Sequence, residues 1–363
     1  MTLPLSRSDE TDPARRGRAL GSAHAARIRD NIAAYRRLFD AVRVRPQDLR
    51  PYGERALAEI ERWAPHLAAE LVATAAGAGV RDWEVAMVNA RTEILATVGA
   101  TAEGECSTAV YVGGPGAPHT IQTWDWHDEM AAARTLSAYR VPAPRAGGAG
   151  RTVRAFTEAG VLGKIGVNDA GLGVHFNILS HQDDGESIGV PVHAVARRVL
   201  DEAATVAEAV DLARSARVSA STVLTVVTYD GRHGEAASIE LSPRGTAVVR
   251  PDADGVLLHT NHFLDPELAL GEEAAAAAST HPRYKRLSDR RELIVSADPA
   301  RWLELMRVHE EDGAPLCCHP KPGLEFQHQW RTLLTLMIDL GGRRLRYHAG
   351  EPCTATDDSW NDL

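Results

Sequence analysis

One cysteine stands where cutting the chain would generate a nucleophile. Cys106 lies in the segment GECSTA at 104–109, at the junction between a helix-like first quarter and a strand-like remainder. If the backbone is cut between Glu105 and Cys106, the thiol and a new α-amine belong to one residue. An α-amine titrates near pKa ~8, so it can act as the general base for its own thiol. The chemistry predicted for Cys106 is nucleophilic attack on a carbonyl carbon.

A carboxylate between two tryptophans is the second chemical element of the sequence. Asp125 lies in the segment QTWDW at 122–126. If two strands join in a hairpin, the Asp125 carboxylate comes back beside Cys106, where it can hold or orient the α-amine. Two other interpretations stay open at this point. Cys106 can be a buried structural cysteine, and Asp125 can cap a turn flanked by aromatic core residues.

Helices are predicted to precede Cys106. In the range 22–99, apolar residues recur every three or four positions, which is typical of amphipathic helices. Pro46 ends the first helix, Pro65 kinks or splits the second, and Gly79 is a stop signal. We expect residues 22–105 to form a helical propeptide or α chain, and residues 1–21 to be a disordered leader.

Strands dominate the prediction after Cys106, because short runs rich in β-branched residues alternate with Gly, Pro and Asp turns. The expected strands are 108–112, 119–123, 152–159, 161–167, 172–179, 221–229, 235–241, 245–250, 255–260, 331–339 and 343–348. The expected helices are 191–216, 282–308 and the alanine run 274–278, and a surface loop is expected over 142–150. The expected strands 221–229 and 331–339 are apolar nearly throughout, so we expect both faces of each strand to be covered. This predicts helices outside a pair of sheets.

The composition argues against several classes of function. The chain has 363 residues, 44% of them hydrophobic, and a formal net charge of −9, which is typical of a globular protein. A negative surface repels phosphate backbones, so nucleic acid binding is not expected. No apolar stretch near the N-terminus resembles a signal peptide or membrane span, and no GxGxxG or P-loop motif opens a helix. We expect a cytoplasmic protein with no membrane partner and no cofactor.

The remaining cysteines form no familiar metal motif. Cys317, Cys318 and His319 are adjacent, and Cys353 follows later in the chain. No pair among them has the ligand spacing of a known zinc site. The sequence therefore predicts no metal site, with Cys317 and Cys353 as small buried hydrophobic residues.

Several separated segments resemble the acyl-CoA:6-aminopenicillanic acid acyltransferase family, also grouped as the C45 peptidases of the Ntn-hydrolase superfamily. Each segment is short, but they occur in the family's order over 89–353, which makes the resemblance specific. Along the chain they are NARTE at 89–93, CSTA at 106–109, QTWDW at 122–126, GKIGVNDAGL at 163–172, TNHFL at 260–264, MIDL at 337–340 and AGEPC at 349–353.

The resemblance implies a fold and a set of catalytic roles. The fold would be α+β, a four-layer αββα Ntn-hydrolase sandwich with a helical N-terminal segment, matured by autocatalytic cleavage into two chains. Cys106 would be the nucleophile, first for self-cleavage between Glu105 and Cys106 and then for the substrate. Asp125 would hold the freed amine, and Asn261 would donate its side-chain amide to the oxyanion.

The resemblance also implies how substrate is held. Asn177 resembles an asparagine that touches the substrate carbonyl in related choloylglycine hydrolases. Trp124 and Thr123 would line the pocket, although Thr123 replaces the family's usual Asn. The substrate would be a small N-acyl or acyl-CoA molecule. Residues 106–363 would be the catalytic β chain of one integrated domain that stays associated with the cleaved α chain, and a homodimer is also compatible with the sequence.

Two further departures from the family pattern concern the active site. The family usually has Gly before the catalytic Cys, where this sequence has Glu105, and a Gly would permit the strained peptide that favours an N-to-S acyl shift. Cys318 stands where relatives often carry an Arg. Arg283 and Arg286 are candidate substitutes for that charge, or they are ordinary surface residues.

Three functions are consistent with these residues. The first is a self-cleaving amidohydrolase or acyltransferase that acts on an N-acyl amide or acyl thioester through a thioester on Cys106, with water or an amine as the acceptor. The second is an unprocessed, non-catalytic relative that acts as a binding or scaffold protein. The third is a cysteine enzyme with a histidine base that never cleaves itself.

Overall fold

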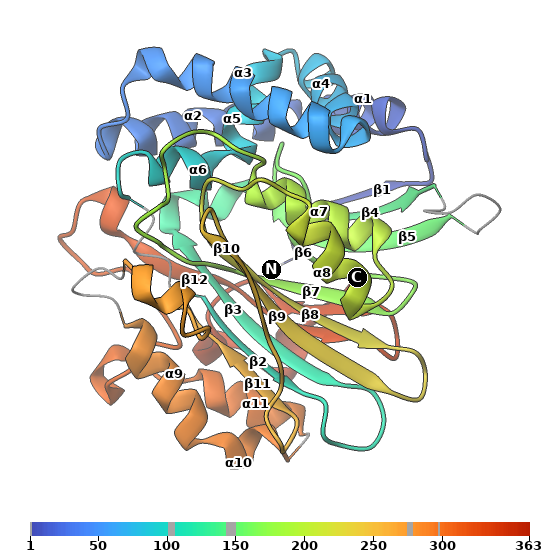
Figure 1. Cartoon of the computed structure of the whole chain (residues 1–363), viewed down its shortest axis with the longest axis vertical. Helices are drawn as coiled ribbons and strands as arrows, with labels where there is room; N and C mark the ends of the chain where they lie inside the picture. The colour runs from blue at the N-terminus through green and yellow to red at the C-terminus, as the bar shows by residue number, and fades with distance from the viewer. Residues whose placement is uncertain (1, 101–105, 143–149, 274–278, 297) are drawn as a thin grey trace.

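The computed structural model describes residues 2–100, 106–142, 150–273, 279–296 and 298–363 (Figure 1). Within these residues the strands form two sheets. The order is β1-β4-β5-β6-β7-β8-β9-β10 in the eight-stranded sheet and β11-β2-β3-β12-β13-β14 in the six-stranded sheet. Strand pairs are antiparallel except β1 with β4. Glu105, the alanine run 274–278 and most of the expected loop 142–150 lie outside the described residues.

Most strand bounds follow the predicted runs, but β3 extends beyond 123 and β6 begins later than 161. The sequence did not indicate β1, β4 or β14. The eight-stranded sheet consists of β1 (Leu5–Ser8), β4 (Arg134–Val141), β5 (Arg151–Glu158), β6 (Ile165–Asn168), β7 (Leu172–Ile178), β8 (Thr222–Tyr229), β9 (Gly234–Ser242) and β10 (Gly245–Val249). The six-stranded sheet consists of β11 (Val256–His259), β2 (Ser107–Tyr111), β3 (His119–His127), β12 (Trp330–Asp339), β13 (Arg344–His348) and β14 (Asn361–Asp362).

Helices cover the outer face of each sheet (Figure 1). The eight-stranded sheet carries α7 (Val192–Glu202) and α8 (Val206–Arg214). The six-stranded sheet carries α9 (Thr280–Asp289), α10 (Arg291–Ile294) and α11 (Pro299–Met306). The predicted α+β fold, a four-layer αββα sandwich with a helical N-terminal segment, is confirmed. Among the described residues, none of the helices combines the length and the apolarity needed to cross a bilayer.

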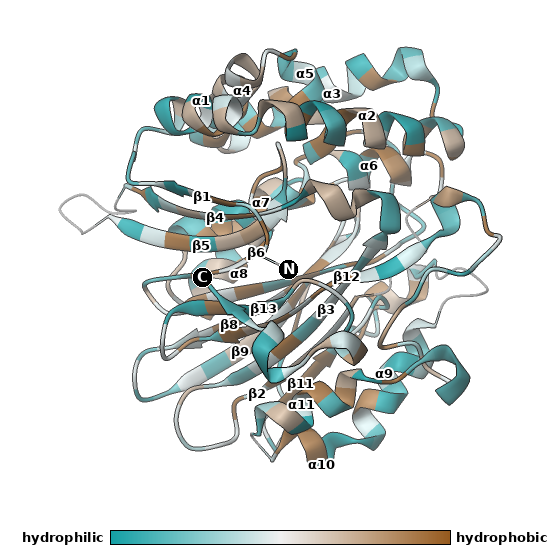
Figure 2. Cartoon of the chain, turned by 180° about the vertical axis from the view of Figure 1, so that it is seen from behind, coloured by the Kyte–Doolittle hydropathy of each residue, from teal (hydrophilic) through white to brown (hydrophobic). Residues whose placement is uncertain are grey.

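The helices that precede Cys106 pack over one end of the sandwich (Figure 1, blue). They show both hydrophilic and hydrophobic colours in Figure 2, as expected of amphipathic helices with one buried side. Ile28, Phe39 and Leu67 belong to the same buried apolar cluster as Phe156 of the body. These helices are α1 (Pro13–Ala23), α2 (Ala25–Ala41), α3 (Pro46–Trp63), α4 (Pro65–Ala78), α5 (Asp82–Asn89) and α6 (Arg91–Ala96).

The prediction of a disordered leader over residues 1–21 is wrong for residues 2–21. The segment Leu5–Ser8 pairs with β4 at the sheet edge, and Asp12 caps α1 by accepting from the backbone N–H of Arg15 at 2.8 Å. Gly17 lets α1 approach α4 closely, because a Cβ there would lie 2.2 Å from the backbone oxygen of Glu70. Because α1 buries small residues and the charged Arg16, a search for regularly spaced apolar residues does not detect it.

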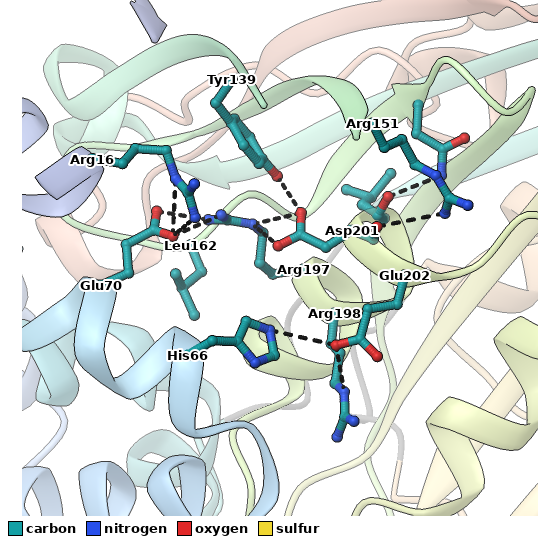
Figure 3. Close-up of polar contacts among 12 residues, drawn as sticks. Arg16, His66, Glu70, Tyr139, Arg151, Leu162, Arg197, Arg198, Asp201 and Glu202 are labelled. Atoms are coloured by element: carbon teal, nitrogen blue, oxygen red, sulfur yellow. Dashed lines mark hydrogen bonds and ion pairs between the residues drawn. The ribbon is translucent and has the colours of Figure 1, made fainter. Parts of the chain in front are cut away.

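A buried chain of charges fastens α1 to the body (Figure 3). Arg16 pairs with Glu70 at 2.5 Å, and Arg197 of α7 donates to the same carboxylate at 2.9 Å. Arg197 also pairs with Asp201, which accepts from the hydroxyl of Tyr139 on β4 at 2.8 Å. Burial alone would raise the pKa of Glu70, but Arg197 and Arg16 outweigh it and hold that pKa at about 2. The carboxylate therefore stays ionised and links α1, α4 and α7.

Candidate active site

Cys106 lies directly before β2, at one end of the β2–β3 hairpin. The register pairs Ser107 with Thr123, so the strand positions beyond this pair bring Cys106 toward the segment that carries Asp125. The Cys106 thiol is buried, with Sγ 3.8 Å from the backbone oxygen of Asp125. The hairpin expected from the sequence therefore does bring these two residues together.

Strand alternation assigns the residues of β3 to two different faces. Trp124 faces the eight-stranded sheet, where its ring packs edge-on against Phe156 at 5.0 Å between centroids. Because side chains alternate along a strand, Thr123 and Asp125 point to the opposite side, toward the helical layer of α9–α11. Thr123 and Trp124, predicted together as substrate-binding residues, thus lie on opposite faces of β3.

Asn177, near the end of β7, joins the two sheets at Cys106. Its side-chain amide donates to the backbone oxygen of Cys106 at 3.1 Å and to that of His259 at 3.4 Å. Its oxygen accepts from the hydroxyl of Thr108 at 2.8 Å and from the amide of Gln122 at 3.2 Å. The predicted substrate-binding residue therefore contacts the candidate nucleophile directly and is held by donors from β2 and β3.

Arg283 on α9 is the residue whose importance the sequence only hinted at. Its guanidinium is fully buried, so the interpretation of Arg283 as a surface charge is wrong. It donates to the backbone oxygen of Cys106 and to the hydroxyl of Ser107, each at 2.8 Å. It also donates to Oδ1 of Asn261 at 2.8 Å. Arg283 therefore supplies positive charge at the site.

Asn261 follows β11 and reaches the site through Arg283. A guanidinium group has no acceptor, so the Asn261 atom that faces it must be the oxygen, which fixes the orientation of the amide. The Nδ2 atom then donates to the backbone oxygen of Ile178 at 2.9 Å. An amide nitrogen has two N–H groups, so this arrangement leaves the second one for another acceptor.

A second buried ionic cluster lies behind Trp124. Glu158 accepts from Arg91 of α6 and from Lys164, each at 2.6 Å, and from the hydroxyl of Tyr35 of α2 at 2.5 Å. The Lys164 ammonium also sits 3.9 Å from the centroid of the Trp124 ring. The sequence pattern assigned no role to these residues. The only signal was that Arg91 and Lys164 fall within the segments NARTE and GKIGVNDAGL.

Two other polar residues of the segment NARTE also bind the helices before Cys106 to the rest of the chain. Asn89 donates to the backbone oxygen of Gly160 and accepts from the N–H of Leu162, both at 2.8 Å. Glu93 accepts from the N–H of Val192 at 2.8 Å, at the start of α7. Side chains from α5 and α6 thus hold the turn at 160–162 and the start of α7.

Comparison with known proteins decides the family. The family model described as acyl-coenzyme A:6-aminopenicillanic acid acyl-transferase matches residues 113–353. The chain belongs to this family. A curated relative, the 40 kDa form of acyl-coenzyme A:6-aminopenicillanic-acid acyltransferase from Emericella nidulans, is 28% identical over 306 residues, covering 82% of this chain and 80% of the relative.

Solved structures with similar folds are more distant. A conjugated bile acid hydrolase variant from Clostridium perfringens aligns with a TM-score of 0.48 and 12% identity, over 71% of this chain and 92% of the other. The penicillin V acylase from Agrobacterium tumefaciens aligns with a TM-score of 0.45 and 21% identity, over 67% of this chain and 83% of the other.

The electrostatics of this acyltransferase-family site keep the thiol protonated in the uncut chain. Burial raises the pKa of Cys106 to about 12, and the nearby Asp125 adds to this increase. Arg283 and Lys164 oppose it only in part. The thiol therefore needs a local base, or a change in its surroundings, before it can attack as a thiolate.

Lys164 is a buried group whose pKa lies close to neutral pH. Burial lowers the pKa of its ammonium to about 7, with the Glu158 carboxylate opposing that effect. Burial would raise the pKa of Glu158, but Arg91 and Lys164 together lower it to about 2. The cluster behind Trp124 thus pairs a carboxylate of lowered pKa with a lysine whose pKa lies near neutral.

His175 on β7 gives the site a measurable response to acid. It is fully buried, with Nδ1 3.0 Å from the side-chain oxygen of Gln122, and burial lowers its pKa to about 3. Between its ordinary value of 6.5 and about 3, the unfolded chain binds a proton that the folded chain does not. Stability must therefore fall as the pH falls through this window, by up to about 1.4 kcal/mol per pH unit for this histidine.

Replacing His175 with glutamine should make the acid response shallower. Glutamine can keep a hydrogen bond to Gln122 but cannot bind the proton. We therefore expect the slope of the free energy of unfolding against pH to decrease by up to about 1.4 kcal/mol per pH unit. Urea unfolding at several pH values between about 4 and 6.5 measures this. His233→Gln, at an exposed position, should keep the original slope. Equal slopes in all three proteins would contradict the assignment to His175.

Proposed function

We propose that this chain is made as an inactive precursor, cuts itself between Glu105 and Cys106, and then transfers or hydrolyses the acyl group of an N-acyl amide or acyl thioester. The observation that carries the proposal is the convergence on Cys106. Arg283 and Asn177 hold its backbone oxygen at 2.8 and 3.1 Å, and its Sγ lies 3.8 Å from the backbone of Asp125. Polar groups from both sheets and from α9 thus fix the backbone of the residue whose sulfur would react.

Maturation starts with attack of the Cys106 sulfur on the carbonyl carbon of Glu105. The C–N bond breaks, the nitrogen takes a proton to become the α-amine of Cys106, and a thioester joins Glu105 to the sulfur. Water then cleaves the thioester, which gives a carboxylate on Glu105 and restores the thiol. The fixed carbonyl of Cys106 holds its backbone still, so that only the sulfur and the scissile peptide need to move.

The mature enzyme repeats the same chemistry on its substrate. The α-amine of Cys106 takes the thiol proton, and the thiolate attacks the acyl carbonyl. The leaving amine or thiol takes the proton, and the acyl group remains on sulfur as a thioester. Water or an acceptor amine then releases the acyl group. Asp125 holds the α-amine, and the second N–H of Asn261 stabilises the oxyanion.

Substrate recognition is assigned to the residues beside the nucleophile. Asn177 is fixed by Thr108 and Gln122, and a substrate carbonyl would replace the backbone oxygen of His259, its longer acceptor at 3.4 Å. Trp124 offers an apolar wall for the acyl chain. Thr123 lies on the other face of β3, which favours a role in supporting Asp125. The substrate class is a small N-acyl or acyl-CoA molecule.

The direct test is the intact mass of the purified protein. We expect two polypeptides that remain associated, the larger of which begins with Cys106 by N-terminal sequencing. The contacts of Asn89, Arg91 and Glu93 with the body explain why the cut pieces should stay together. A single uncut chain of 39.2 kDa that binds acyl compounds without turning them over would favour the scaffold function instead.

Arg283 should control the rate of maturation. In Arg283→Leu the Cys106 carbonyl loses a donor and Asn261 loses the group that orients its amide. Loss of an oxyanion-hole donor typically costs about 10²–10³-fold in rate. Because Arg283 orients Asn261, the proposed donor, we expect cleavage to slow by up to that factor in a gel-based time course. Lys285→Gln removes an exposed charge from the same helix and should mature at the normal rate. Normal cleavage in Arg283→Leu would remove Arg283 from the mechanism.

A further inference from the structure

Four potential metal ligands meet outside the active site. One ligand atom from each of His309, Cys317, His319 and Cys353 lies within 4.8 Å of the other three. His309 follows α11, Cys317 and His319 belong to the loop before β12, and Cys353 lies in a short helical turn after β13. The fold thus collects two thiols and two imidazoles from three separate segments.

The distances within this cluster match tetrahedral coordination. Zinc–sulfur bonds of about 2.3 Å and zinc–nitrogen bonds of about 2.0–2.1 Å, at tetrahedral angles, place sulfur and nitrogen ligands about 3.6 Å apart. Nε2 of His319 lies 3.3 Å from Sγ of Cys317 and 3.5 Å from Sγ of Cys353. The ligands therefore already surround a volume suited to one small ion.

A carboxylate also lies near the outer side of one ligand, as is common at metal sites. A metal-bound histidine commonly directs its other ring nitrogen to a carboxylate. Nδ1 of His319 lies 3.7 Å from Oε1 of Glu351, while Nε2 faces the two sulfurs. Glu351 is itself held by Arg331 at 2.5 Å. The carboxylate thus lies on the side of the ring away from the two sulfurs, where it can hold the ring as a metal ligand requires.

We propose that His309, Cys317, His319 and Cys353 bind one zinc ion as a structural site. Two thiolates and two imidazoles favour zinc over magnesium or calcium, which prefer oxygen ligands. Four protein ligands close the coordination sphere, which is typical of a structural and not a catalytic site. On binding, the two thiols lose their protons and the ion takes the resulting thiolates.

The site would brace the strand next to the active site. The N–H of Cys318 donates to the hydroxyl of Thr332 at 2.9 Å, and the N–H of Thr332 donates to the oxygen of Cys318 at 3.0 Å. Thr332 of β12 is the cross-strand partner of Asp125. A zinc ion would therefore tie the C-terminal segment at Cys353 to a loop that is bonded beside Asp125.

The test counts zinc on the full-length protein. The reduced, chelator-treated chain is loaded with zinc chloride, freed of excess metal by gel filtration and analysed by elemental mass spectrometry. We expect about one zinc per chain in the original protein. His309→Ala and the double variant Cys317→Ser/Cys353→Ser should fall below about a tenth of that value, because each loses at least one of four ligands. Cys318→Ala, which changes the neighbouring cysteine outside the cluster, should keep about one zinc.

Three results would overturn the site: no zinc retained by the original chain, equal zinc in the cluster variants, or a Cys317–Cys353 disulfide in place of two thiols by peptide mass spectrometry. If a variant misfolds, the absorption spectrum of cobalt(II) bound to the original chain decides. Thiolate ligands give a charge-transfer band and support the site, whereas oxygen ligands give none and would contradict it. The Cys106→Ala chain should bind the same amount of zinc, so the count is independent of the proposed function.

Discussion

Replacing Cys106 with alanine should leave the purified protein as one full-length chain with no acyl-transfer or hydrolytic activity. The substitution removes the only atom that would attack the Glu105 carbonyl and, later, the substrate. Loss of a covalent nucleophile typically costs on the order of 10⁴-fold or more in turnover. Intact mass and an assay of acyl release from a model N-acyl amide measure the two effects. The side chain lost is small and buried, so the folded state should survive.

Cys318→Ala is the matched control for this experiment. It removes a second buried thiol that plays no part in the proposed chemistry, and this variant should still be cut and active. Cleavage at the same bond in Cys106→Ala would exclude the self-processing mechanism. A Cys106→Ser variant that cuts more slowly, but at the same bond, would agree with it, because a hydroxyl is a weaker nucleophile than a thiol.

Replacing Glu158 with leucine should strongly destabilise the fold. The variant leaves Arg91 and Lys164 buried without the carboxylate that both of them contact at 2.6 Å. Removing one partner of a buried ion pair typically costs about 3–5 kcal/mol, because the remaining charge is left in a medium that solvates it poorly. Denaturant unfolding of the Cys106→Ala background, which should stay a single chain, measures the free energy cleanly.

Glu54→Gln provides the comparison for Glu158→Leu. Glu54 pairs with Arg50 on the exposed side of α3, where both side chains are more than half exposed. Exposed pairs of this kind contribute about 0.2–1 kcal/mol, so the free energy of unfolding should change little. If Glu158→Leu also changes the free energy of unfolding by less than about 1 kcal/mol, the buried cluster does not hold the helices before Cys106 to the rest of the chain.

The hairpin that carries Cys106 and Asp125 could be predicted because it depends on local sequence. The strands β2 and β3 are close in the chain, and their β-branched residues and intervening turn specify the pairing. The apolar runs of β8 and β12 likewise indicated sheets covered on both faces. The order of short segments over 89–353 added the family and its fold, which residue patterns alone would not have supplied.

The contacts of Arg283 and the grouping of His309, Cys317, His319 and Cys353 could not be predicted because the partners are distant in sequence. Arg283 meets Cys106 across 177 residues, and Cys353 meets His319 across 34. The missed elements α1 and β4 share a related cause. Arg16 and Tyr139 are polar residues that are buried because other elements supply their hydrogen-bond partners, so a pattern of apolar spacing does not reveal them.

If the chain is cut as proposed, the core shared by the helices before Cys106 and the strands after it makes stability depend on protein concentration. Before cleavage, unfolding is a reaction of one molecule. Afterwards the leader helices and the strands that bury Ile28, Phe39 and Phe156 together belong to two polypeptides, so unfolding can release two products. Dilution then favours the unfolded state, and the melting temperature becomes dependent on protein concentration. Maturation would thereby turn one folding unit into an obligate heterodimer whose halves were synthesised at a fixed ratio of one to one.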